Sequence, residues 1–326
     1  MRTHKGMIRG GLVLTGLAVA ALAAPPVMAE EFPSKEIEVV THAGAGGGTD
    51  VTSRMMMLRT RREMKQDMVV VNKRGGGGAA AMNYTMTRPA DGYTVFALTI
   101  GHIAQLAQGK STMTMDDIVP IARATDDPQI LMASCNNAPF KTPAEFIEYS
   151  KANTVTYGTT HVGSIDDVSA YIFTGRAGLK PAKIVPFKGG GELATNLVAG
   201  AVHIGVLNLS EAEAQISAGD ICPMVVLAEK RMAPIPDVPT AKDLGYDVVF
   251  STVRGFAVRK GVPEDRVKIL EAKMLKGMSH GVYQGFLTSV GLTSDSVAGA
   301  DVWGKQVKQL YTEMRQALKE AGFEVK

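Results

Sequence analysis

Residues Thr41 to Thr52 read THAGAGGGTDVT, with an alternating apolar run before them and an amphipathic run after them. This order predicts a strand, a glycine-rich turn and a helix. Glycine adopts positive φ without strain and leaves no Cβ between the backbone and a ligand. The first N–H groups of a helix lack internal partners, and the helix dipole favours negative charge, so such a turn attracts anions. We therefore expect an anion site at Gly46, Gly47, Gly48, Thr49 and Asp50, with Thr49 or Asp50 as the N-cap.

The glycine pattern does not match the two common phosphate-binding motifs. Read as G-x-G-x-x-G from Gly44, its third glycine position holds Thr49, and read from Gly46 it holds Val51. The Gly-Lys-Ser that begins at Gly109 has an alanine where a phosphate loop needs its first glycine. A small carboxylate is therefore the favoured anion. A tight turn that binds no ligand is the alternative.

The first 29 residues have the features of an export signal. Arg2, Lys5 and Arg9 form a charged start, an apolar core spans residues 11–24, and small residues precede a cleavage site after Ala29. The apolar core is too short to remain as a membrane-spanning helix. We therefore expect a soluble periplasmic protein after cleavage.

Charge gives no reason to expect a nucleic-acid or membrane-surface partner. The chain has 35 basic and 32 acidic residues, and the export signal holds three of the basic ones and no acidic one. The mature chain is therefore balanced, since 35 − 3 = 32 basic residues face 32 acidic ones. Attraction for an anion must come from local groups.

The rest of the chain repeats the order of strand and helix, which predicts an α/β fold with doubly wound parallel sheets flanked by helices. Residues 155–158 form a strand that leads into a small polar turn ending at Ser164, and a helix is expected over 166–175. This second strand–turn–helix unit resembles the first. Two anion-binding turns of one kind suggest two similar lobes that face one cleft, with candidate ligand contacts at Thr159, His161, Gly163 and Ser164.

Further candidates lie where other strands end, because ligands of such sheets bind at the carboxyl ends of strands. Thr99 and His102 fall in a loop after one strand, where a histidine is more often only solvated. Asn208 follows another strand. Arg254 lies in an extended stretch and could bind a second carboxylate through its planar guanidinium, or instead form a surface or interdomain ion pair. Asp50 would repel a carboxylate, so we expect it to cap the helix or orient the turn; a ligand amino group or ordered water is the alternative partner.

Cys135 and Cys222 are the two cysteines. In an oxidising compartment the two cysteines can form a disulfide or remain two free buried thiols, and their spacing alone does not decide between these alternatives. No cysteine or histidine pattern indicates a metal site, and no motif indicates a cofactor.

A set of motifs occurs in one order along nearly the whole mature chain: AGGGTD at 45–50, NKRG at 72–75, PADGYT at 89–94, YG at 157–158, GS at 163–164, PFKGG at 186–190 and PDVPT at 236–240. This set resembles the extracytoplasmic solute receptors of tripartite tricarboxylate transporters, the citrate-receptor-like or Bordetella uptake gene family.

The resemblance implies a two-lobed, type II periplasmic-binding-protein fold. It places lobe 1 at residues 30–128 plus 250–326 and lobe 2 at residues 129–249, joined by two crossovers. It also implies a small organic acid held between the lobes by backbone N–H groups at 46–50 and 159–164. The expected partners are membrane transporter subunits, and the receptor is expected to be a monomer without enzymatic activity or cofactor.

Two other functions use the same cleft. A hydrolase or transferase is the first, but the chain contains neither G-x-S-x-G nor H-E-x-x-H. A sensory receptor that presents its ligand to a signalling partner is the second, and its cleft would look the same.

Overall fold

The computed structural model describes residues 1–3, 6, 31–160 and 164–320. The chain divides into two compact units, Met1–Phe32 and Pro33–Lys326, and the second contains the strands and helices. The predicted export signal lies almost wholly outside the described residues, as do His161 and Gly163. Within these described ranges, none of the helices combines the length and the apolar content that a membrane span requires.

The first sheet has the order β11-β4-β10-β3-β1-β2 in the described part of the chain. Its parallel half consists of β1 (Ile37–Thr41), β2 (Met68–Asn72) and β3 (Thr94–Thr99). The other half consists of β4 (Ile118–Pro128), β10 (Ser251–Arg259) and β11 (Ala298–Gly299). Strand β10 pairs antiparallel with both β3 and β4, so the prediction of parallel pairing was wrong for this half.

The second sheet has the order β7-β6-β8-β5-β9. Parallel pairing joins β6 (Thr156–Thr159) to β7 (Lys183–Pro186) and to β8 (Ile204–Leu207). Strand β5 (Ile130–Ser134) runs antiparallel to β8 and to β9 (Ile221–Val226). Each sheet is therefore mixed, with parallel βαβ units that reach one edge and, beside them, an antiparallel strand that arrives from the other sheet.

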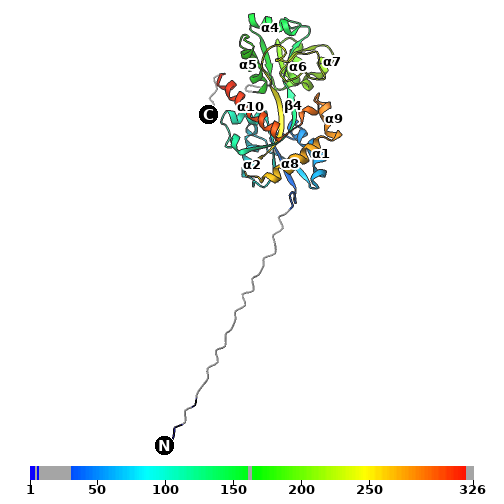
Figure 1. Cartoon of the computed structure of the whole chain (residues 1–326). Helices are drawn as coiled ribbons and strands as arrows, with labels where there is room; N and C mark the ends of the chain where they lie inside the picture. The colour runs from blue at the N-terminus through cyan, green and yellow to red at the C-terminus, as the bar shows by residue number, and fades with distance from the viewer. Residues whose placement is uncertain (4–5, 7–30, 161–163, 321–326) are drawn as a thin grey trace. The chain divides into compact units, whose positions relative to one another are not determined.

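Helices cover the two sheets separately (Figure 1). Around the first sheet lie α1 (Gly48–Met64), α2 (Ala79–Thr87), α3 (Ile100–Ala107), α8 (Glu264–Met278), α9 (Gly281–Ser289) and α10 (Ala300–Glu320). Around the second lie α4 (Pro143–Ala152), α5 (Ile165–Arg176), α6 (Gly190–Val198) and α7 (Leu209–Ser217). The predicted two-lobed α/β fold, with a helix-flanked sheet in each lobe, is confirmed.

Two segments carry the chain between the sheets and hydrogen-bond to each other. The N–H of Gln129, between β4 and β5, donates to the carbonyl of Phe250 at 2.9 Å. The N–H of Leu227, just after β9, donates to the carbonyl of Gln129, also at 2.9 Å. The long strands β4 and β10 pair with each other and continue into these crossings. The two sheets are therefore connected through paired backbone.

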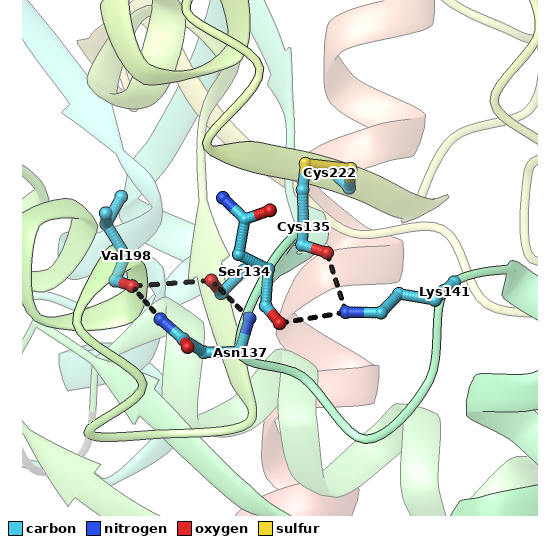
Figure 2. Close-up of a disulfide and its surroundings, with 7 residues drawn as sticks. Ser134, Cys135, Asn137, Lys141, Val198 and Cys222 are labelled. Atoms are coloured by element: carbon cyan, nitrogen blue, oxygen red, sulfur yellow. Dashed lines mark hydrogen bonds between the residues drawn. A yellow bond between two sulfur atoms is a disulfide. The ribbon is translucent and has the colours of Figure 1, made fainter.

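A disulfide joins Cys135 to Cys222, which closes a loop with a sequence separation of 87 residues (Figure 2). The two residues come together because β5 and β9 are antiparallel neighbours, with Ala133 opposite Cys222. The Lys141 ammonium donates to the Cys135 carbonyl at 2.7 Å and holds the loop after β5. The structure thus settles the alternative that spacing had left open.

Candidate functional site

The turn between β1 and α1 has the predicted order but a different cap. Helix α1 begins at Gly48, and its N-cap is Gly47, which has no side chain to offer. Thr49 and Asp50 lie inside the first turn, so the prediction that one of them is the N-cap was wrong. Gly46 has φ = +80°, a conformation that favours glycine.

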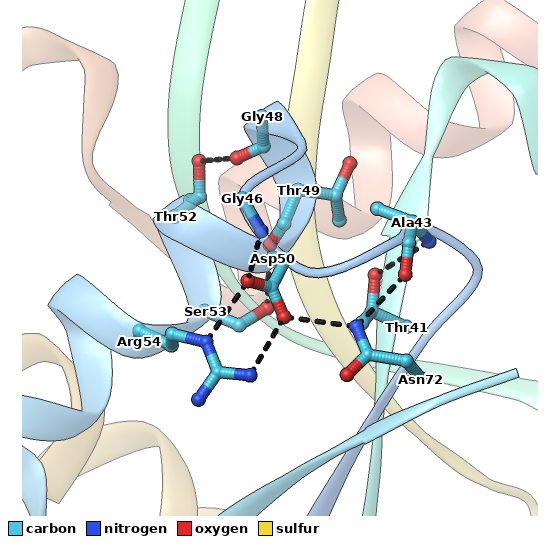
Figure 3. Close-up of polar contacts among 10 residues, drawn as sticks. All are labelled: Thr41, Ala43, Gly46, Gly48, Thr49, Asp50, Thr52, Ser53, Arg54 and Asn72. Atoms are coloured by element: carbon cyan, nitrogen blue, oxygen red, sulfur yellow. Dashed lines mark hydrogen bonds and ion pairs between the residues drawn. The ribbon is translucent and has the colours of Figure 1, made fainter.

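Asp50 fastens this turn from within the helix (Figure 3). Its carboxylate accepts hydrogen bonds from the N–H of Gly46 at 2.9 Å, the Arg54 guanidinium at 2.9 and 3.0 Å, and Asn72 Nδ2 at 2.9 Å. Asn72 Nδ2 also donates to the carbonyl of Ala43 at 2.8 Å. Asp50 therefore orients the turn, one of the roles expected for it.

These contacts keep Asp50 ionised. Its side chain is 1% exposed, and the pKa is lowered to about 2, chiefly by the hydrogen bond from Arg54 and further by those from Asn72 and Gly46. Desolvation acts in the opposite direction and is outweighed. The negative charge of Asp50 is thus neutralised by the positive charge of Arg54.

The first backbone N–H groups of α1 remain available. Val51 N–H makes the first intrahelical bond, to the carbonyl of Gly47 at 2.9 Å. Among the described residues, the N–H groups of Gly48, Thr49 and Asp50 donate no hydrogen bond. A helix of 17 residues directs its dipole at this point, so the end of α1 carries partial positive charge.

Arg254 lies against the same helix end. It occupies β10, opposite Thr99 on β3 and Thr125 on β4, and is half-buried. A Cβ placed on Gly48 would lie 3.2 Å from Arg254 Nη2, so the guanidinium packs directly over the helix N-terminus. In the described part of the chain, this guanidinium forms no ion pair and donates no hydrogen bond. A guanidinium and a helix N-terminus in contact repel each other unless an anion lies between them.

Two carboxyl groups near Arg254 were not predicted. Asp127 on β4 is 6% exposed, and burial raises its pKa to about 7 although the positive charge of Arg254 opposes the rise. Burial likewise raises the pKa of Glu211 in the first turn of α7, again against Arg254. In the sequence both look like ordinary surface acids, and only their tertiary burial distinguishes them.

His102 is not a solvated loop residue, contrary to the expectation for it. Thr99 ends β3 and caps α3, and His102 lies in the first turn of that helix with 0% exposure. The Thr99 N–H donates to His102 Nδ1 at 3.1 Å, so Nδ1 is unprotonated. Desolvation lowers the pKa of His102 well below its usual value, so the ring is neutral. The His42 ring packs edge-on against it with centroids 4.5 Å apart, and together they back the β1–α1 turn.

The second turn, between β6 and α5, repeats the construction of the first. Ser164 caps α5 by accepting the N–H of Asp167 at 3.2 Å. Asp166, in the first turn, accepts the N–H of Thr160 at 2.9 Å, as Asp50 accepts that of Gly46. The Thr159 side chain is fully buried at the end of β6. His161 and Gly163 lie outside the described residues.

Asn208 is engaged with the crossing strands. It is the N-cap residue of α7, and its Nδ2 donates to the backbone carbonyls of Asp127 at 2.9 Å and Pro128 at 3.1 Å. Its Oδ1 accepts from Thr252 Oγ1 at 3.2 Å. The side chain thus joins α7 of one sheet to β4 and β10 of the other. Its position fits a connector of the two sheets better than a direct ligand contact.

The structure therefore gathers one set of predicted residues around the end of α1, namely Gly46 to Asp50 and Arg254. The turn before α5 lies on the other sheet, where the charges of Asp166 and Glu211 act on each other. The charge of Arg254, on the first sheet, also acts on Glu211. An exposed guanidinium, that of Arg74, also lies at the first turn, 3.4 Å from where a Cβ on Gly44 would be. The arrangement can hold an anion by backbone N–H groups and a fixed guanidinium.

The chain matches a family model and known relatives over most of its length. The family model of the tripartite tricarboxylate transporter family receptor matches residues 52–317. Protein BugT of Bordetella pertussis is 30% identical over 240 residues, which are 71% of this chain and 72% of that protein.

Solved structures show the same fold. A TctC solute-binding protein from Polaromonas, determined without ligand, is 27% identical with a TM-score of 0.83, over 89% of this chain and 99% of that one. MatC from Rhodopseudomonas palustris with bound malate is 25% identical with a TM-score of 0.68, over 88% of this chain and all of that one. Since the family model spans most of the sequence and the fold agrees, the chain belongs to the receptors of the tripartite tricarboxylate transporter family, which are periplasmic solute-binding proteins.

Proposed function

We propose that this protein captures a small organic acid between its two lobes and delivers it to the membrane subunits of a tripartite tricarboxylate-type transporter. The observation that carries the proposal is the contact between the Arg254 guanidinium and the uncapped N-terminus of α1, with no anion from the described residues between them. The structure of MatC with malate, at 25% identity, supports a carboxylate as the ligand class.

The proposed lobes are residues 30–128 plus 250–326 and residues 129–249. Strand membership supports this division, because β1 to β4, β10 and β11 form one sheet and β5 to β9 form the other. Closure would then bring the α1 and α5 turns onto opposite sides of one ligand. The paired backbone at Gln129, Leu227 and Phe250 is the proposed hinge.

The proposed contacts can account for a useful affinity. A hydrogen bond to a charged group contributes about 1.5–3 kcal/mol, so four of them supply about 6–12 kcal/mol. Association and ordering cost at least about 4 kcal/mol. The net value is therefore about 2–8 kcal/mol, and its upper end corresponds to a micromolar dissociation constant. Backbone N–H groups and one guanidinium are thus sufficient, and a net positive protein charge is unnecessary.

The remaining features are proposed from family membership and sequence. We propose export by residues 1–29 with cleavage after Ala29, a monomeric receptor, and release of the ligand chemically unchanged. N-terminal sequencing of the exported protein tests the first, and a mature chain that begins elsewhere than Glu30 contradicts it.

A thermal-shift screen tests the ligand class. Mature protein is unfolded and refolded to remove carried ligand, and then mixed with mono-, di- and tricarboxylates, aromatic acids and acidic amino acids. Each acid is paired with its uncharged amide as a control. At a hundred times its dissociation constant, a ligand stabilises the protein by about 2.7 kcal/mol. We expect a shift with an acid and none with its amide. Equal thermal shifts for an acid and its amide contradict the proposal. The absence of any thermal shift with all the acids, when the protein is shown to be folded, also contradicts it.

A further inference from the structure

The surroundings of Arg254 contain more negative than positive side-chain charge. The positive charge of Arg254 acts on both Asp127 and Glu211, and the two carboxyls act on each other. Among the described residues, neither carboxyl forms an ion pair with any lysine, arginine or histidine. One half-buried cation therefore serves two largely buried carboxyls.

We infer that the ligand is a zwitterion that carries a protonated amine beside its carboxylate, as an amino acid does. Its carboxylate occupies the α1 N-terminus and Arg254, and its ammonium group faces Asp127 and Glu211. This inference rests on the proposed function, because it assumes that the α1 end and Arg254 hold a carboxylate. It adds a second, acidic half to the same site.

The strand register places Asp127 on the Arg254 side of the first sheet. Arg254 is opposite Thr125 and Thr252 is opposite Asp127, without a bulge between these pairs. Residues two apart on a strand point to the same face, so the Asp127 and Arg254 side chains lie on one face as diagonal neighbours. Diagonal positions are typically about 7–8 Å apart, a distance that an arginine side chain can span. Among the described residues, however, no ion pair joins Arg254 to Asp127, so a small charged group between the two would meet both.

Asp127 has an unused acceptor. Its Oδ1 is buried and has no hydrogen-bond partner among the described residues, and neither has Thr125 Oγ1 on the same face. A buried carboxylate oxygen without a donor is costly. An ammonium group carries three donors and a positive charge, which is the partner that these atoms lack.

Glu211 brings the second carboxyl from the other sheet. Its Oε2 accepts the N–H of Asn208 at 2.9 Å, and its carboxyl fills the space in front of Gly190 at the start of α6. Asn208 also donates to the backbone of Asp127, so the two acids belong to one network that spans both sheets. An ammonium between them would contact both lobes.

Charge counting separates this ligand from a dicarboxylate. A dicarboxylate places two more negative charges beside two carboxyls that share one guanidinium, and like charges at this range repel in a partly desolvated site. An amino acid adds one charge of each sign, and each meets its opposite. The raised pKa of Asp127, about 7, agrees with a carboxyl that lacks a cation in the ligand-free protein.

Matched pairs of ligands test the inference. Refolded mature protein is titrated by calorimetry at pH 8 with acids that differ only in the α-amino group: propionate and alanine, succinate and aspartate, glutarate and glutamate, 3-phenylpropionate and phenylalanine. The same titrations use Asp127→Asn and Glu211→Gln. Glutamine still accepts the Asn208 N–H, so the α7 cap is retained. Glu213→Gln, an exposed change on the same helix, is the control.

We expect the amino member of the pair that binds best to bind at least tenfold more tightly than its amine-free partner. Asp127→Asn and Glu211→Gln should each reduce this ratio at least threefold, and Glu213→Gln should leave it unchanged. Equal or tighter binding of the amine-free acid overturns the inference while the proposed function stands. An affinity ratio in favour of the amino acid that stays unchanged in both Asp127→Asn and Glu211→Gln also overturns the inference. Failure of every acid and amino acid to bind overturns the inference and the proposed function together.

Discussion

Replacing Arg254 by alanine should separate ligand binding from folding. The guanidinium makes no ion pair or hydrogen bond with the described residues, so its removal breaks none of these in the ligand-free protein. Relief of its repulsion with the α1 N-terminus is worth about 0.3–1 kcal/mol, while Asp127 and Glu211 lose a neighbouring positive charge. These effects offset each other, and we expect the free energy of unfolding to change by less than about 1 kcal/mol.

The effect on binding should be much larger. A bidentate guanidinium–carboxylate contact consists of two charge-assisted hydrogen bonds of about 1.5–3 kcal/mol each. Their loss of about 3–6 kcal/mol corresponds to a roughly 10²- to 10⁴-fold weaker affinity. Calorimetric titration with the best acid from the screen measures the affinity, and urea denaturation without ligand measures the stability.

Two further variants make the result specific. Arg254→Lys keeps the charge but loses the planar fork, so its affinity should fall between those of wild type and Arg254→Ala. Arg62→Ala removes an exposed arginine near the opposite end of α1 and should change neither quantity. An affinity within threefold of wild type in Arg254→Ala refutes the assignment. A ligand-free protein destabilised by several kcal/mol would instead show that Arg254 has a structural role.

Three other predictions follow from named contacts. Gly48→Val places a Cβ 3.2 Å from Arg254 Nη2 and should weaken acid binding at least tenfold. Gly281→Val is the control, because this first residue of α9 has open space around it, and it should leave acid binding unchanged. Equal titration curves for the two variants would contradict this prediction. Replacing both Cys135 and Cys222 by serine opens a loop with a sequence separation of 87 residues. The free energy of unfolding, measured by urea denaturation, should fall by up to about 4.6 kcal/mol, and the affinity for the acid should not change. A free energy of unfolding equal to that of the oxidised wild type would contradict this prediction. Asp127 has a folded pKa of about 7 against 3.8 ordinarily, so the folded state holds its proton more tightly, and stability is lost as pH rises from about 4 through 7. Asp127→Asn should therefore stabilise the ligand-free protein at pH 8 and not at pH 4, and a gain independent of pH would exclude this cause.

The sequence predicts the local units of the fold well, because short-range patterns encode them. The β1–α1 turn lies where its glycines indicated, and the second turn ends at Ser164, which does cap α5. The N-cap of α1 was misassigned since Gly47 offers no side chain. Asp50, inside the helix, instead accepts the N–H of Gly46 in the turn before it, and the first N–H groups of α1 have no side-chain cap.

Pairing direction was beyond sequence reasoning. Strand β10 alternates like any other strand, and nothing local says that it returns between β3 and β4 in antiparallel orientation. The sequence could not decide whether Cys135 and Cys222 form a disulfide for the same reason, because the two residues meet only when β5 and β9 become neighbours. Such long-range contacts depend on the whole topology.

The charged half of the site was missed because burial defines it. Asp127 and Glu211 stand among other polar residues in the sequence, and only the packing of β4, β10 and α7 removes them from water. His102 was misjudged as a solvated loop residue for the same reason. Its ring is buried against Phe96 and His42, neighbours that come from β3 and from the end of β1.

A crystal structure of the refolded protein with the acid that gives the largest thermal shift tests the central claim most directly. The account predicts carboxylate oxygens about 2.7–3.2 Å from the N–H groups of Gly48 to Asp50 and from the Arg254 guanidinium. A ligand bound with its carboxylate away from both the α1 N-terminus and Arg254 would contradict it.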